Sequence, residues 1–476
     1  MRRRCIPLLC LFALTGLGAE NPNILFIAID DLRPELGCYG LDYMQTPHID
    51  QLARQGRLFE RHYVQAPTCG ASRYALLTGK YGPAGNGALF ARARRMGKDA
   101  AGTTPTLPAL LRQHGFTTVS VGKVSHHPGG MGGPNWDNPA KLETPDSWDR
   151  NLMPSGAWKH PRGAMHGLAH GEIRRKASEM AVFQSAAGDD SIYPDGLITE
   201  QAVRELSELS KGESPFFLAV GIIRPHLPFG APAKYMEPYL NTDLPPIHPV
   251  KPEGRSTWHG SGEFMKYQRW GRNPNNDPEF ALEVRRHYAA SVSYADAQVG
   301  KILAQLDALG LAESTIVVVW GDHGWHLGEH AIWGKHSLFD ESLHAPLVIR
   351  TPDMALAGRP SRAVVEAVDL YPTLCQLAGL SPPAGLDGEH FLDELILPQA
   401  TDGYAISYKG NAVTIRSQTH RLTAHKNGFL ELYDHRSPEK ETRNIAEESP
   451  ATAQELLRVL TMRVPEKVSQ ALRARQ

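Results

Sequence analysis

The sequence predicts an α/β fold, in which a doubly wound sheet covered by helices is followed by a small antiparallel subdomain. Two observations predict it: continuous apolar runs that alternate with helical patterns, and short alternating runs after Pro383. The length of 476 residues has room for both parts. With 41% hydrophobic and 21% charged residues, the composition argues against a disordered, collagen-like or coiled-coil chain.

The predicted large sheet is built on four buried strands. Each is an apolar, β-branched run, which is typical of a strand buried on both faces of a parallel sheet. Ligands bind such sheets at the carboxyl ends of the strands, so the residues after each run are candidates for chemistry. We place the strands at residues 23–29, 117–121, 216–223 and 315–320, and helices at residues 106–114, 197–210 and 282–309.

Two other segments have a different sequence pattern from that of the predicted large sheet. Residues 128–195 are rich in Gly, Pro, Trp and His without a regular period, which predicts long loops over the sheet. The C-terminal part predicts an antiparallel meander with strands at residues 404–408, 412–416, 420–425 and 429–433, and then an amphipathic helix at residues 451–475. The predicted division is a large domain at residues 20–383 and a C-terminal subdomain at residues 384–476.

The N-terminus has the pattern of an export signal. Three arginines at positions 2–4 precede an apolar run at residues 6–17, and Ala19 offers a small-residue cleavage point. We therefore expect a signal peptide at residues 1–19, no stable membrane span, and a mature protein that is soluble in the periplasm or outside the cell. An uncleaved membrane anchor is the alternative.

The cysteine count and the net charge limit the disulfide pairing and the classes of binding partner that we expect. Removal of the signal leaves Cys38, Cys69 and Cys375, and three cysteines cannot all pair within one chain, so at least one thiol is free, modified or intermolecular. Lys and Arg number 50 against 51 Asp and Glu, for a net charge of -1. This balance offers no general attraction to nucleic acid or to an anionic membrane, and we expect neither as a partner.

Carboxylates gather at the predicted carboxyl edge of the sheet. Asp30 and Asp31 follow the first strand, and Asp322 and His323 follow the strand at residues 315–320. Adjacent carboxylates at the mouth of an apolar strand repel each other unless a cation neutralises them. Carboxylate oxygens favour calcium or magnesium, whereas the imidazole leaves manganese or zinc open. Either pair in isolation is more often a turn or a helix cap.

The segment APTCGASRYALLTG at residues 66–79 contains a candidate reactive cysteine. Cys69 lies where a loop enters a helix, and Arg73 follows one turn later. A helix N-terminus and a guanidinium both stabilise an anion at this position. The alternative is a buried cysteine that only caps the helix.

At these residues the chain resembles the sulfatase family, whose signature begins with a cysteine, has an arginine four residues later and continues into Leu-Thr-Gly. The resemblance extends from residues 22–24 to residues 444–446. Within the family, residues 224–229 and 322–330 are most similar to the iduronate-type branch. The resemblance implies the alkaline-phosphatase-like fold, which is a large mixed sheet sandwiched by helices with a smaller C-terminal sheet. It also implies that residues 20–383 are the catalytic domain of a sulfuric ester hydrolase.

The resemblance implies that Cys69 is oxidised during maturation to formylglycine, whose aldehyde hydrates to a geminal diol. One hydroxyl, acidified by the metal, attacks sulfur, and the other later loses its proton and expels sulfate. A formylglycine-generating enzyme or a radical maturation enzyme is an implied partner. Ala71 stands where many members have proline, which leaves open which of the two acts.

The metal site and the catalytic residues follow from the same resemblance, position by position. The implied ligands hold one divalent cation, usually Ca2+ in the family, and are Asp30, Asp31, Cys69, Asp322 and His323. The implied catalytic residues include Arg73, which holds the formylglycine, and Lys123 and Lys335, which bind sulfate. His126 is the implied base for diol collapse, with His127 as the competing choice. His226 is implied to lie at the leaving ester oxygen.

Substrate selection is the least determined part. Arg224, Trp325 and the loop at residues 128–195 are candidate walls, since an aromatic ring stacks on a sugar and an arginine pairs with a uronate. The implied substrate is a sulfated oligo- or polysaccharide, with a 2-O-sulfated uronic acid as one candidate.

Two other functions stay open on the sequence. The first is a phosphoryl hydrolase that uses the same metal edge. The second is a catalytically silent carbohydrate-binding protein in which Cys69 remains a thiol.

Overall fold

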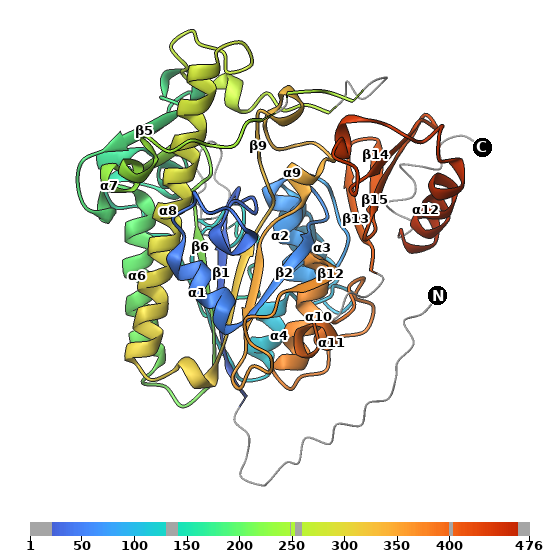
Figure 1. Cartoon of the computed structure of the whole chain (residues 1–476). Coiled ribbons are helices and arrows are strands. Elements are labelled where there is room, and N and C mark those ends of the chain that lie inside the picture. Colours follow the sequence, from blue (N-terminus) through green and yellow to red (C-terminus); the bar gives the residue numbers. More distant parts are fainter. Residues whose placement is uncertain (1–20, 130–140, 248, 253–258, 399–402, 465–476) are drawn as a thin grey trace.

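The computed structural model describes residues 21–129, 141–247, 249–252, 259–398 and 403–464. Within them the chain forms a large α/β part and a smaller C-terminal sheet (Figure 1), which confirms the predicted fold class. The predicted signal peptide at residues 1–19 lies outside the described residues, as do residues 465–475 of the predicted C-terminal helix.

Eight strands form the central sheet: β1 (Asn23–Ile29), β2 (Arg57–Tyr63), β3 (Thr117–Gly122), β4 (Arg150–Leu152), β6 (Phe216–Ile222), β8 (Thr315–Gly321), β11 (Leu347–Arg350) and β12 (Ser361–Glu366). Their order is β12-β2-β11-β8-β1-β6-β3-β4. The strands from β8 to β4 run parallel, whereas β11 is antiparallel to both of its neighbours, so the sheet is mixed.

Helices cover both faces of this sheet (Figure 1). Alternate residues of β1 point to opposite faces, with Leu25 and Ile27 in one core and Ile24 and Phe26 in the other. The first core is closed by α1 (Pro47–Gln55), α6 (Pro194–Leu209) and α8 (Pro278–Ala308), and the second by α2 (Cys69–Thr78), α4 (Leu107–Gln113) and α10 (Leu370–Leu377).

Apolar patterning predicts four of the eight strands of the central sheet closely, misses β2, β4, β11 and β12, and predicts the helix starts less closely. The four predicted strands agree with β1, β3, β6 and β8 to within one residue at each end. α8 begins at Pro278, before the predicted residue 282, because the Asp277 side chain accepts a hydrogen bond from Phe280 N at 3.0 Å and caps the helix. α6 likewise begins early, with Pro194 in its first turn.

The prediction of loops alone at residues 128–195 is wrong in part. The segment includes β4, the short helix α5 (Pro161–Met165) and β5 (Phe183–Ala186), which pairs with β7 (Phe229–Pro232). These short elements are stabilised by the segments that they pair with. Their own sequences show no apolar periodicity, so the sequence did not predict them. The other α-helices and strands described before residue 403 are α3 (Ala88–Met96), α7 (Ala233–Met236), α9 (Asp340–Leu343), α11 (Leu392–Ile396), β9 (His326–Leu327) and β10 (Trp333–Gly334).

The C-terminal sheet is an antiparallel meander of β13 (Ala405–Lys409), β14 (Ala412–Arg416), β15 (His420–His425) and β16 (Leu430–Asp434), and α12 (Pro450–Arg463) packs on it. Arg421 ties this sheet to the large domain. Its buried guanidinium donates to Asp340 and Glu441 and lies 5.5 Å from the ring centroid of Tyr63. Among the described residues, no helix is both long enough and apolar enough to cross a membrane.

We predict that position 221 in β6 tolerates only glycine. A Cβ there would lie 2.0 Å from the carbonyl carbon of Lys123, which follows the neighbouring strand. Gly221→Ala should therefore lower the free energy of unfolding by about 1–3 kcal/mol, measured by urea denaturation. Gly87→Ala is the control, because its Cβ would meet no atom within 4 Å. An equal loss in both variants would contradict the prediction.

Candidate active site

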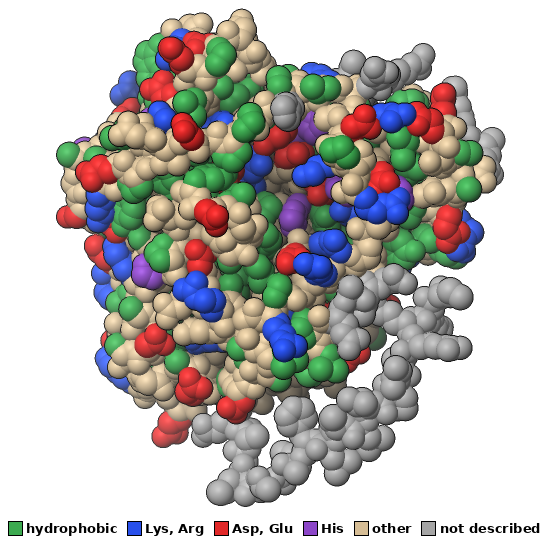
Figure 2. Space-filling view, in the orientation of Figure 1, with side chains coloured by type: hydrophobic (Ala, Val, Ile, Leu, Met, Phe, Trp, Pro, Cys, Tyr) green, Lys and Arg blue, Asp and Glu red, His purple; other side chains and the backbone are tan. Residues whose placement is uncertain are grey.

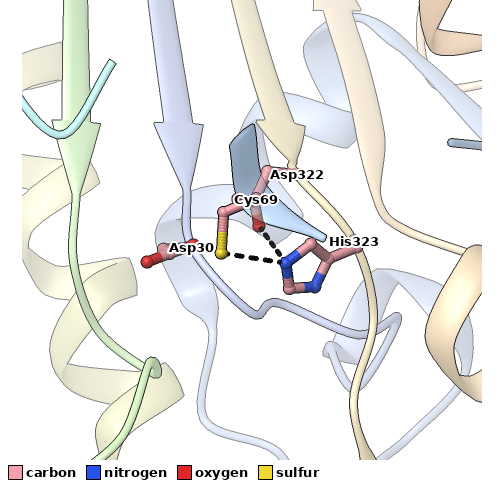
Figure 3. A group of neighbouring side chains, drawn as sticks. All are labelled: Asp30, Cys69, Asp322 and His323. Carbon is pink, nitrogen blue, oxygen red and sulfur yellow. Dashed lines mark hydrogen bonds and ion pairs between the residues drawn. The ribbon is translucent and has the colours of Figure 1, made fainter. Parts of the chain in front are cut away.

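The predicted acidic residues meet at the carboxyl ends of two neighbouring strands. Asp30 and Asp31 follow β1, and Asp322 and His323 follow β8, which is the parallel partner of β1. The backbone N–H of Asp31 donates to Asp322 Oδ1 at 2.9 Å. Figure 3 shows Asp30, Asp322 and His323 around Cys69. On the same side of the molecule, Figure 2 shows a hollow beside the C-terminal sheet where histidine, basic and acidic side chains gather.

Cys69 is the first residue of α2 and is only 2% exposed. Its Sγ lies 3.2 Å from His323 Nε2, 3.3 Å from Lys335 Nζ and 4.0 Å from Lys123 Nζ. The helix can begin here because Gly70 has no side chain: a Cβ at that position would lie 2.5 Å from the backbone of Asn86. The thiol therefore sits at a helix N-terminus among three nitrogen groups.

Arg73 joins the two strand ends from one helical turn beyond Cys69. Its Nε donates to Asp322 Oδ2 at 3.0 Å, and its terminal nitrogen lies 3.3 Å from Asp30 Oδ1. The same guanidinium donates to the carbonyl of Val124 at 3.0 Å. All of these groups are buried, so the arginine replaces the water that the carboxylates lose.

The two predicted lysines each pair with one aspartate. Lys123 Nζ forms a buried ion pair with Asp30, and Lys335 Nζ lies 2.7 Å from Asp31 Oδ1. Both ammonium groups also approach Cys69. The lysines therefore provide fixed positive charge on the Cys69 side of the cluster.

His226 belongs to the same cluster. It offers a ligand atom within 4.8 Å of atoms of Asp30, Asp31 and Cys69. Its Nδ1 lies 2.7 Å from the carbonyl oxygen of Leu227, which can only accept, so Nδ1 carries a proton and Nε2 is the atom left for a ligand.

His126 and His127 differ in their partners. The His127 ring lies 3.2 Å from a carboxylate oxygen of the buried Glu143, and its backbone N–H donates to the same carboxylate. Burial and the charge of Lys123 lower the pKa of His126 well below its ordinary value, which keeps this ring neutral. A neutral imidazole suits a proton acceptor, which is the role that the family resemblance implies for His126.

Burial opposes the ionisation of all three carboxylates, and the neighbouring cations outweigh it only at Asp30. At Asp30, burial opposes ionisation but Lys123 and its neighbours outweigh it and hold the pKa well below the ordinary value. At Asp31, burial outweighs the attraction of Lys335 and raises the pKa well above that value. Burial and the charge of Asp30 raise the pKa of Asp322 to about 7. A further positive charge would therefore be favourable at this point.

The residues fit one divalent cation. Asp31 Oδ2 is buried and accepts no hydrogen bond from the described residues, an expensive state for a carboxylate oxygen unless a cation binds it. Ligand atoms of Asp30, Cys69, Asp322 and His323 lie within 4.8 Å of one another. A donor set rich in carboxylate oxygens suits a hard cation such as Ca2+.

The two predicted substrate residues are both fully buried. The Arg224 guanidinium donates to backbone carbonyls, including Gly230 O at 3.2 Å, and so holds the loop that carries His226. A substrate carboxylate could reach it only by breaking these bonds. The Trp325 ring lies beneath Lys335, with Nζ 5.4 Å from its centroid. The structure thus places neither side chain on an open wall.

Three further residues complete the site and are missing from the sequence prediction. Ser72 donates its hydroxyl to the carbonyl of Asp322, Glu143 holds His127, and Glu263 Oε2 lies 3.7 Å from Lys335 Nζ. Ser72 follows Cys69 by three residues, so helical spacing places both on one face and could have identified it. Glu143 and Glu263 lie in irregular segments, where no period or motif marks them.

Comparisons with known proteins agree with this geometry. A sequence profile described as Sulfatase matches residues 22–380, and one described as N-sulphoglucosamine sulphohydrolase, C-terminal, matches residues 328–470. Iduronate 2-sulfatase of Homo sapiens is 34% identical over 395 residues, which cover 76% of this chain and 70% of that protein. A sulfatase of Formosa agariphila is 28% identical over 454 residues, or 90% of this chain and 83% of that protein.

Solved structures share the fold. The phosphonate monoester hydrolase of Agrobacterium radiobacter aligns with a TM-score of 0.70 and 22% identity, over 93% of this chain and 96% of that one. At this identity the likeness establishes the architecture and not the reaction.

We predict that the acidic cluster binds one divalent cation per chain and that Asp322→Ala abolishes this binding, because the variant loses a carboxylate that the other ligands surround. Metal content measured by mass spectrometry after gel filtration in calcium buffer tests the change directly. Asp296→Asn, at a buried carboxyl that instead accepts from Ile49 N at 2.7 Å, should keep its metal. Normal metal content in Asp322→Ala would remove Asp322 from the ligand set.

Proposed function

Because the chain belongs to the sulfatase family and is a sulfuric ester hydrolase, we propose that it cleaves O-sulfate esters of a sulfated carbohydrate with a formylglycine made from Cys69 and one divalent cation, Ca2+. The observation that carries the proposal is the set of contacts around Cys69. A nucleophile position at a helix N-terminus touches Lys335, lies near Lys123 and adjoins a carboxylate cluster with the character of a metal site.

When present, the formylglycine supplies an oxygen nucleophile and the cation supplies Lewis-acid polarisation of the sulfate oxygens. The chain's own residues do the rest. Lys123 and Lys335 would neutralise the sulfate oxygens, since both ammonium groups face position 69. Arg73 holds Asp30 and Asp322 in place, so that little reorganisation is needed when charge develops.

Two histidines would handle the protons. His226 presents Nε2 toward the cluster and is placed to donate to the leaving ester oxygen once protonated. His126 is buried and neutral, and is suited to take the proton from the oxygen at position 69 that later expels sulfate.

The substrate that we propose is a 2-O-sulfated uronic acid within a sulfated oligo- or polysaccharide. Support comes from the 34% identity to an iduronate 2-sulfatase. We also propose that the protein is exported after loss of residues 1–19, and that a formylglycine-generating or radical enzyme matures Cys69.

We predict that Cys69→Ala abolishes sulfate release while the fold remains, because alanine cannot be oxidised to the nucleophile. Turnover of 4-nitrophenyl sulfate and thermal unfolding measure the two effects. Cys38→Ala is the control and should keep at least about half of wild-type activity, since Cys38 is not part of the site. Substantial residual turnover in Cys69→Ala would refute the assignment.

Mass spectrometry of the tryptic peptide from His62 to Arg73 provides an independent check on the same residue. An aldehyde at position 69 in protein from its native host would support the proposed nucleophile. A wholly unmodified thiol would favour the silent carbohydrate-binding protein.

A paired assay separates sulfate from phosphate chemistry. We expect kcat/KM for 4-nitrophenyl sulfate to exceed that for 4-nitrophenyl phosphate by at least about tenfold, because two fixed lysines and one cation match a monoanionic ester. A preference for the phosphate would make the protein a phosphoryl hydrolase.

A further inference from the structure

Glu263 is an acidic side chain next to the lysine that touches Cys69. Its Oε2 lies 3.7 Å from Lys335 Nζ and 3.8 Å from His336 Nε2. Lys335 is 3% exposed, whereas the side chains of Glu263 and His336 are 26% and 29% exposed. The two residues therefore flank the lysine on its more open side, one side chain away from the reacting centre.

Glu263 and His336 both have acceptor capacity that they do not use. Glu263 Oε2 accepts no hydrogen bond from the described residues, and its two contacts are longer than a hydrogen bond. His336 Nδ1 lies 2.9 Å from the carbonyl oxygen of Pro67, so the proton of a neutral ring is on Nδ1 and Nε2 is an acceptor. Burial and Lys335 lower the pKa of His336 to about 4, which keeps the ring neutral near pH 7. Two acceptors cannot bond to each other, so both are open to a donor from a third molecule.

The segment that carries Glu263 is held at both ends. His259 Nε2 lies 3.0 Å from a carboxylate oxygen of Glu431 in the C-terminal sheet, and both side chains are buried. Phe264 is buried against Trp333, with ring centroids 5.6 Å apart. These contacts on either side hold the Glu263 carboxylate in place beside Lys335. A residue that selects substrates needs such a fixed position.

We propose that Glu263 and His336 bind the hydroxyl group next to the sulfate ester on the sugar, and that Glu263 selects against a second anionic group at that place. The inference rests on the proposed function, because it takes Lys335 as a sulfate ligand. A hydroxyl donates to the carboxylate in a charge-assisted hydrogen bond, whereas a second sulfate is repelled by it. For a 2-O-sulfated uronic acid, this selects residues whose 3-hydroxyl is free.

A matched pair of aryl sulfates tests the hydroxyl contact. 2-Hydroxyphenyl sulfate carries a donor next to the ester, and 2-methoxyphenyl sulfate replaces it with a group that cannot donate. We expect the wild type to prefer the hydroxyl probe in kcat/KM, and Glu263→Ala to lower this preference at least about tenfold. Glu263→Gln keeps an acceptor oxygen and should keep part of the preference.

The disulfate of the same ring tests the charge. Glu263→Gln should raise kcat/KM for 1,2-phenylene disulfate relative to 2-hydroxyphenyl sulfate, because it removes the repulsion and keeps the shape. Glu179→Gln, at an exposed glutamate paired with Lys176, is the control and should leave the ratio unchanged.

The outcomes separate this inference from the function on which it rests. If Glu263 only positions Lys335, both members of the first pair fall by one factor and the preference stays as in the wild type, which overturns the inference alone. If the wild type turns over no aryl or carbohydrate sulfate, the proposed function fails and the inference falls with it. A lower preference together with the altered disulfate ratio supports it.

Discussion

The buried guanidinium of Arg73 is the interaction on which the rest of the site depends. It reaches from α2 to the ends of β1 and β8, and it also binds a carbonyl of the loop that follows β3. One side chain therefore fixes the helix that presents Cys69 against three strands of the sheet. Without it, two carboxylates would remain buried with too few partners, a state that typically costs about 3–5 kcal/mol.

The fold explains why such a concentration of charge is tolerable. β1, β6 and β8 are almost wholly buried, so they hold their carboxyl ends in fixed positions while the polar residues are confined to the edge. At that edge each of the three carboxylates has its own cation: Asp30 has Lys123, Asp31 has Lys335 and Asp322 has Arg73. Asp31 Oδ2, which accepts no hydrogen bond from the described residues, is the group left for a further cation.

Four of the eight strands of the central sheet and the acidic edge of the site were predictable from sequence because they follow simple patterns. Uninterrupted apolar runs locate β1, β3, β6 and β8, and the residues after those strands supply Asp30 and Asp322, whereas Lys123 was implied by the family resemblance. The substrate side was less predictable, because it depends on loops. Arg224 looks like a surface arginine in sequence but is buried under backbone carbonyls, and Glu263 reaches the site from an irregular segment. The positions of these side chains result from tertiary contacts, which leave no periodic pattern in the local sequence.

The burial of α2 sets an order of events during synthesis. Every residue of this helix is buried, and the thiol of Cys69 is closed in by residues that follow β8. Ser72 and Asp322 are 250 residues apart in the sequence. The ribosome therefore makes the residues that cover Cys69 roughly 12–50 s after it has made α2. The proposed maturation enzyme would therefore meet Cys69 while the segment is still an unfolded peptide. Under the proposed maturation of Cys69, modification competes with folding for the same segment, and the length of chain between α2 and β8 sets the time available.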